Sequence, residues 1–151
     1  MTTQINILDK EQIKVSLAAL KADATPLWGK MTPQQMVEHL VKEVEYTNGK
    51  LKAASTTPPD VAEMDKKAKL YSDFEIPRNV NLGPLPETYR FPNLEMAINQ
   101  LMQELDDFDK YYDQPGATAV HFAFGPMGRD EWHIWHGKHF THHFKQFGLI
   151  P

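Results

Sequence analysis

Six of the seven histidines of this chain lie between His121 and His143, close to its C-terminal end. Within this segment His139 and His143 are four residues apart. On an α-helix, side chains at that spacing lie one turn apart on the same face. Two such histidines can bind one metal ion, as they do in the H-E-x-x-H zinc motif. The spacing therefore predicts two ligands of a metal site.

The other histidines of the segment have less favourable positions on the same helix. His136 shares the face but lies two turns from His143, roughly 10 Å along the axis, which is too far for both to bind one small ion. His133 and His142 turn toward other faces, because a step of three residues rotates each side chain by about 60°. A third ligand must come from another element. His39 is the one histidine that falls within another predicted helix.

Three neutral imidazoles suit Zn²⁺, Ni²⁺, Cu²⁺ or Fe²⁺ and suit Mg²⁺ or Ca²⁺ poorly. Three protein ligands also leave a coordination position open for water or substrate, as catalytic zinc sites do. A bound water could then ionise near neutral pH, or a substrate oxygen could be polarised. Candidate acid or base groups beside such a site are His121, His136 and Glu38. The alternatives are a loop position for His121, the mouth of the site for His136 and a solvated helix face for Glu38.

Four amphipathic segments are predicted to be the helices that position these residues. They run from near Asp9 to Leu20, from Thr32 to Asn48, from about Asn93 to Tyr112, and from Gly128 to Phe147. Asp9 and Gln12 have the spacing of a capping box at the first helix. The second helix has the clearest start, because Thr32 and Gln35 match the same box and Pro33 occupies the first helical position. Between Asn93 and Tyr112, apolar residues recur in steps of four and three, as in a bundle helix.

A long proline-rich connection separates the second and third predicted helices. A connection of this length should hold structure of its own, and a short helix is predicted from about Pro59 to Leu70. Several apolar residues beyond it are expected to fold over the helices: Phe74, Ile76, Leu82, Leu85, Tyr89 and Phe91. The segment from Thr118 to Phe124 could be extended, but a single strand does not make a sheet. The expected fold class is therefore all-α.

Composition limits the classes of protein to consider. The 151 residues fit a single domain, residues 1–151, with 41% apolar and 24% charged residues. A net charge of -4 argues against a nucleic-acid binder. The absence of cysteine excludes disulfides, a thiolate nucleophile and any zinc or iron–sulfur site with cysteine ligands. Neither a signal peptide nor an apolar span of ~20 residues is recognised, so we expect a cytoplasmic protein with no membrane partner.

The C-terminal segment resembles the last helix of the DinB-like metal-dependent bundle superfamily, in a branch known as a domain of unknown function. The core of the match is the pattern His-x-x-His-His-x-x-Gln at His139, His142, His143 and Gln146. Residues 28–40, which begin Trp28-Gly29, are similar to the second helix of the same family, with His39 at its ligand position.

This resemblance implies an antiparallel four-helix bundle. The long proline-rich connection, which the resemblance hardly covers, would join its helices 2 and 3. The resemblance also implies a metal centre carried by His39, His139 and His143. Relatives include thiol-dependent transferases and isomerases that use mycothiol or bacillithiol with zinc or nickel, and they often form homodimers.

Two functional hypotheses follow. The first is a metal-dependent enzyme, a hydrolase or a thiol transferase, that acts on a small molecule. The second is a non-catalytic bundle that binds a metal or a small ligand, in which the metal mainly locks helices together. A DNA-associated role, which the superfamily's name suggests, is disfavoured by the acidic charge balance and the lack of a basic stripe.

Overall fold

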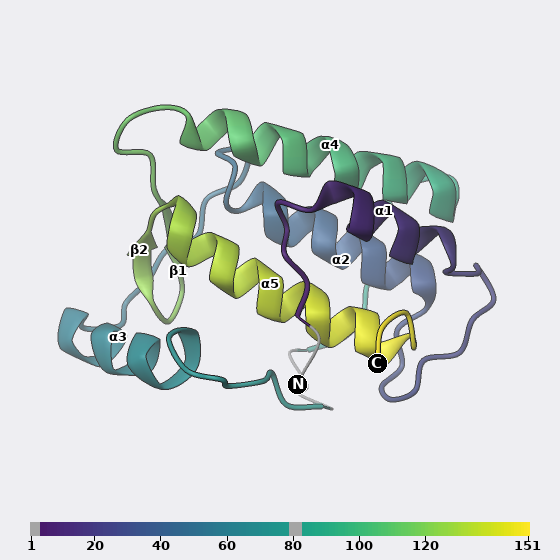
Figure 1. Cartoon of the computed structure of the whole chain (residues 1–151), viewed down its shortest axis with the longest axis horizontal. Helices are drawn as coiled ribbons and strands as arrows, with labels where there is room; N and C mark the ends of the chain where they lie inside the picture. The colour runs from purple at the N-terminus through teal and green to yellow at the C-terminus, as the bar shows by residue number, and fades with distance from the viewer. Residues whose placement is uncertain (1–3, 79–82) are drawn as a thin grey trace.

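The structure is a computed structural model that describes residues 4–78 and 83–151 (Figure 1). This part of the chain is mostly helical. Its helices are α1 (Lys10–Ala18), α2 (Pro33–Glu45), α3 (Pro59–Asp65), α4 (Leu94–Tyr112) and α5 (Arg129–Gln146), and a π-helical turn, η1 (Lys66–Leu70), continues α3. Two short strands, β1 (Ala119–His121) and β2 (Gly125–Met127), pair in antiparallel fashion. No described helix has the length and apolarity that crossing a membrane requires.

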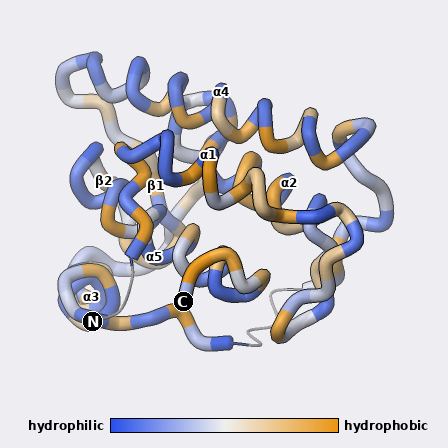
Figure 2. The backbone as a smooth tube through the Cα atoms, turned by 45° about the vertical axis from the view of Figure 1, so that its right-hand side comes forward, coloured by the Kyte–Doolittle hydropathy of each residue, from blue (hydrophilic) through white to orange (hydrophobic). Residues whose placement is uncertain are grey.

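Helix α2 lies against both α4 and α5, and α1 packs on α4 (Figure 1). Hydrophilic and hydrophobic residues alternate along α4, as expected for a helix with one buried face (Figure 2). The buried apolar side chains of these helices form one core, which includes Met36, Leu40, Val44, Leu101, Leu105, Phe108, Phe140 and Phe144. The four long predicted helices are thus confirmed as elements.

The predicted start of α2 is confirmed in detail. The Thr32 hydroxyl accepts a hydrogen bond from the Gln35 amide, and the Gln35 side chain accepts one from the Thr32 amide at 2.9 Å. At α1 only half of the predicted box forms. Asp9 accepts from the Gln12 amide, but the Asp9 amide itself donates to the carbonyl of Asn6. Both helices nevertheless begin where the capping residues predict.

The proline-rich connection contains the expected short helix, as α3 followed by η1. The apolar residues beyond it cover the helices only in part. Phe74, Ile76, Leu85 and Phe91 are half-buried, whereas Tyr89 is 49% exposed. Leu82 lies outside the described residues.

The all-α expectation is wrong at one point, because β1 and β2 form a small sheet. His121 pairs with Gly125 across a tight turn, and the His121 Nδ1 atom accepts hydrogen bonds from the amides of Ala123 and Phe124 at 3.0 and 3.2 Å. The second strand contains Gly125 and Pro126, two residue types that are depleted in strands. Its sequence therefore carries little strand signal and does not predict a partner for the extended segment.

The N-terminal segment holds α5 in place from one side. Ile5 is buried, and its amide donates to the Thr141 hydroxyl at 2.8 Å. A Cβ atom at Gly137 would lie 2.8 Å from the carbonyl oxygen of Ile5. Glycine at this position in α5 therefore permits the close approach of the two segments.

We expect Thr32→Ala to lower the free energy of unfolding by about 1 kcal/mol, because it removes the side-chain acceptor at the start of the helix that carries His39. Chemical denaturation measures this change. Thr32→Ser is the matched control, since it keeps the hydroxyl and should retain most of the stability. An equal loss in both variants would show that the methyl group, rather than the cap, matters.

Candidate metal centre

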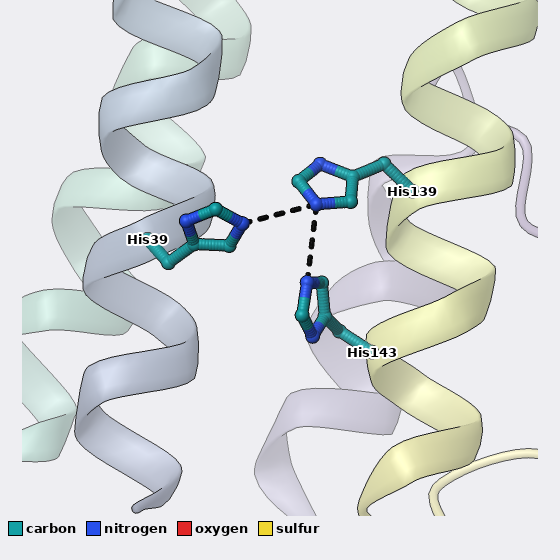
Figure 3. A group of neighbouring side chains, drawn as sticks. All are labelled: His39, His139 and His143. Carbon is teal, nitrogen blue, oxygen red and sulfur yellow. Dashed lines mark hydrogen bonds between the residues drawn. The ribbon is translucent and has the colours of Figure 1, made fainter. Parts of the chain in front are cut away.

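Three histidines from two helices converge on one point. His39 extends from α2, and His139 and His143 extend from α5, with their rings directed toward one another (Figure 3). The His139 Nε2 atom lies 3.0 Å from the His39 Nε2 atom and 3.1 Å from the His143 Nε2 atom. The potential ligand atoms of all three lie within 4.8 Å of one another, so the group could hold a metal ion.

The local sequence explains why these side chains meet. His139 and His143 follow one another by one helical turn, and the neighbouring Phe140 and Phe144 are fully buried, which fixes the rotation of α5. On α2, Leu40 is fully buried in the same core and sets the rotation that brings His39 to the facing side. The ligand pair predicted from spacing and the distant third histidine are therefore brought together.

The two short nitrogen–nitrogen distances, both measured from His139, are close to those between two ligands of one bound ion. Tetrahedral ligands at metal–nitrogen distances of about 2.0–2.1 Å lie roughly 3.3 Å apart. The His139 Nε2 atom faces two other imidazole nitrogens, yet it carries at most one proton and can donate to only one of them. A cation satisfies all three lone pairs at once, so the donor set fits a metal.

Burial keeps these imidazoles in the neutral form that binds metal. It lowers the pKa of His39 to about 4, with a smaller contribution from the charge of Lys42. Burial and then the neighbouring His39 lower the pKa of His143 to about 3. The pKa of His139 lies well below its usual value, because of burial first and then the neighbouring His143. All three are therefore neutral at pH 7.

Gln146 orients His143, one of the three candidate ligands. Its amide nitrogen donates to the carbonyl of Trp28 at 3.0 Å, so its amide oxygen faces the His143 Nδ1 atom at 2.7 Å. That nitrogen must carry the proton, which leaves the His143 Nε2 atom as the lone pair for a metal. Gly29 permits the arrangement: it has a φ of +76°, and a Cβ atom there would lie 3.0 Å from the Gln146 amide nitrogen. The sequence singled out Gln146 in its motif, but not the Trp28 carbonyl that holds it.

His136 lies in the core rather than at the mouth of the site. It is 1% exposed, and its ring stacks on Trp132. Its Nε2 atom lies 2.9 Å from the Thr47 hydroxyl. Because that hydroxyl donates to the carbonyl of Val44, it accepts from His136. Nothing in the sequence pointed to Thr47 as the partner of this histidine.

The other two candidate acid or base groups also have structural partners. His121 uses its Nδ1 atom to close the turn between β1 and β2. Glu38 accepts hydrogen bonds from the amides of Arg90 and Phe91 at 2.7 and 3.0 Å, and so anchors the end of the proline-rich connection on α2. His133 and His142 lie on other faces of α5, as the helical spacing predicts, with His133 against Phe108.

We expect Gln146→Ala to weaken metal binding by roughly 10–100-fold, because it frees the His143 ring and its tautomer. Competition with a chromophoric chelator measures the affinity. Gln103→Ala, on the exposed side of α4, is the matched control and should leave the affinity unchanged. Equal affinities of the Gln146 variant and the wild type would remove the orienting role.

We also expect the metal-free protein to lose stability as the pH falls from about 6.5 toward 4. In this window the unfolded histidines take up protons, while His39 and His143, whose pKa values are about 4 and about 3, stay neutral in the folded chain. The free energy of unfolding should therefore rise with pH, by up to about 1 kcal/mol per pH unit for each histidine. Denaturation at several pH values tests this, and the double variant His39→Gln/His143→Gln should show a smaller slope. An unchanged slope would mean that these two imidazoles titrate normally.

Comparison with known proteins places the chain in a family. The model of the family described as "Protein of unknown function (DUF1569)" matches residues 3–148. Searches among curated proteins and among solved structures found no match. The matched residues span nearly the whole chain and include all three converging histidines. The chain therefore belongs to the DUF1569 family.

Proposed function

We propose that this chain is a metal-dependent enzyme of the DinB-like type, a hydrolase or a thiol transferase acting on a small molecule. His39, His139 and His143 would bind one ion, Zn²⁺ or Ni²⁺, and leave a coordination position open. The observation that carries the proposal is the convergence of three neutral imidazole nitrogens at distances of 3.0 and 3.1 Å. Imidazole is a good ligand for both metals.

The arrangement of the long helices supports the DinB-like part of the proposal. Helices α1, α2, α4 and α5 share one core, and the proline-rich connection joins α2 to α4. His39 and His139 are 100 residues apart, so the site joins an early helix to the last one. Metal sites built in a bundle core take their ligands from facing helices in this way. The proposal also includes a cytoplasmic location, and a homodimer like those of the relatives that the sequence resembles.

The environment of the three histidines suits the activation of a water or thiol by a bound metal ion. A bound ion would act as a Lewis acid and lower the pKa of a water or thiol that binds to it. The chain supplies neutral imidazoles, since burial lowers their pKa values. His39 and His139 retain some exposed surface, whereas His143 is buried. In this proposal a small molecule would approach from the side of His39 and His139.

One observation favours a second candidate, a metal-binding bundle without turnover. His121, His136 and Glu38 all have hydrogen bonds that serve the fold. In this alternative the ion ties α2 to α5, and metal binding contributes directly to the stability of the folded chain.

The wild-type protein should bind one Co²⁺ or Zn²⁺ ion per chain, as measured by elemental analysis after removal of excess metal. His139→Ala should lower the affinity by more than about 100-fold, since it removes a ligand rather than its support. His133→Ala, in the same helix on another face, is the matched control and should bind normally. Equal loss in both variants, or a wild-type protein without affinity for either metal, would overturn the proposed site.

The absorption spectrum of the Co²⁺-loaded protein distinguishes an enzyme with an open metal site from a bundle with a closed structural site. If the site is open, azide or a small thiol should shift the visible d–d absorption bands, because the added ligand enters the coordination sphere. A closed structural site should give bands that do not respond, together with a large rise in melting temperature on metal binding.

A further inference from the structure

A cavity of about 250 Å³ lies on a face of α5 other than the one that carries the metal ligands. Its walls are the C-terminal half of α5, the segment Phe74–Arg78 and Trp28. That segment follows η1 and runs past α5 along the lower side of Figure 1. The volume approaches the roughly 300 Å³ at which pockets for small molecules begin.

The segment Phe74–Arg78 is held on α5 by side chains at helical spacing. Lys138 donates to the carbonyl of Phe74 at 2.8 Å, and His142 lies 3.1 Å from the carbonyl of Ile76. Lys145 forms an ion pair with Glu75 at 3.2 Å. Lys138, His142 and Lys145 lie on one face of α5, so together they fix the segment Phe74–Arg78 as one wall of the cavity.

Lys138 places a buried positive charge in this wall. The residue is 7% exposed, and its ammonium group donates to the carbonyls of Ser72 and Phe74 at 3.0 and 2.8 Å. Within residues 4–78 and 83–151 it has no carboxylate at ion-pair distance, and Asp73 and Glu75 act on it from further away. An ammonium has three donors, and buried charges are normally paired. The third N–H donor of the Lys138 ammonium group and its positive charge are therefore available to a ligand.

Arg78 brings a second cation to the same cavity. Its guanidinium lies over the Trp28 ring, 4.2 Å from the centroid. In the part of the chain that the structure describes, Arg78 forms no ion pair with a carboxylate, and the buried Trp28 Nε1 atom has no acceptor. A guanidinium fixed on an aromatic ring presents its remaining donors in a fork that matches carboxylate and phosphate oxygens.

The cavity is therefore cationic in an acidic protein. Arg78, Lys138 and Lys145 line it, and among the described residues that line it Glu75 is the one acidic side chain. Glu75 is already paired with Lys145. The excess positive charge contrasts with the net charge of -4 of the whole chain.

We propose that this cavity is a binding site for the oxyanion group, carboxylate or phosphate, of a small molecule. Lys138 and Arg78 bind the charged group, and Trp28 provides an aromatic surface for the rest of the ligand. The site is distinct from the three-histidine centre and does not depend on a bound metal. It adjoins that centre. The centroids of the His142 and His143 rings are 4.9 Å apart, and the carbonyl of Trp28 accepts a hydrogen bond from Gln146.

Titration of the metal-depleted 151-residue chain tests the proposal, with inorganic phosphate and, separately, benzoate as probes. Backbone amide NMR shifts should saturate, with a dissociation constant on the order of 1 mM, and should centre on the residues that line the cavity. Lys138→Met and Arg78→Met should each weaken binding by at least about tenfold, since each removes a charged donor. Lys21→Met, an equal change of charge at an exposed lysine, should bind as the wild type does. Stronger binding of phosphate identifies a phosphate ester as the ligand class, and stronger binding of benzoate identifies a carboxylic acid.

The variant His139→Ala separates this site from the metal centre. It should retain the affinity for the probe anion although it loses metal. Loss of anion binding in His139→Ala would mean that the anion binds at the histidines, which overturns the proposal. Shifts that do not saturate with either probe, or wild-type affinity in Arg78→Met, would also overturn it. Arg78 is exposed, so this variant decides the question even if Lys138→Met fails to fold.

Discussion

The close approach of three imidazole nitrogens between α2 and α5 is the constraint on which the rest of the arrangement depends. Neutral nitrogens 3.0 and 3.1 Å apart cannot all be satisfied by their own protons, so other contacts must hold the two helices in position. The capping box of Thr32 begins α2, and the N-terminal segment packs on Gly137 of α5. The shared apolar core then supplies the free energy that keeps the histidines together.

Two faces of helix α5 contribute to two neighbouring candidate sites. One face directs His139 and His143 toward α2, and another uses Lys138, His142 and Lys145 to hold the segment Phe74–Arg78. Trp28 contacts both sites, because its carbonyl accepts a hydrogen bond from Gln146 and its ring lies under the guanidinium of Arg78. The candidate metal centre and the cationic cavity therefore share a wall that includes Trp28.

The histidine-rich segment is not a set of equivalent ligands. Its members differ in environment: His136 is buried beside Thr47, His121 closes a turn, and His142 contacts the carbonyl of Ile76. Burial lowers the pKa of His121 to about 4 and that of His136 to about 3, so a low pKa does not by itself identify the ligands. Convergence of three nitrogens distinguishes the candidate site from the structural histidines.

The sequence by itself determined the features that depend on near neighbours in the chain. The starts of α1 and α2 follow from capping side chains that accept hydrogen bonds from amides three residues ahead, and the His139–His143 pair follows from the helical period. Three features became known only from the tertiary structure. They are the pairing of β2 with β1, the hydrogen bond between His136 and Thr47, and the hydrogen bond from the Gln146 amide to the carbonyl of Trp28. The last two contacts join residues 89 and 118 positions apart. Such contacts leave no periodic signal in the sequence, because they depend on how whole helices pack.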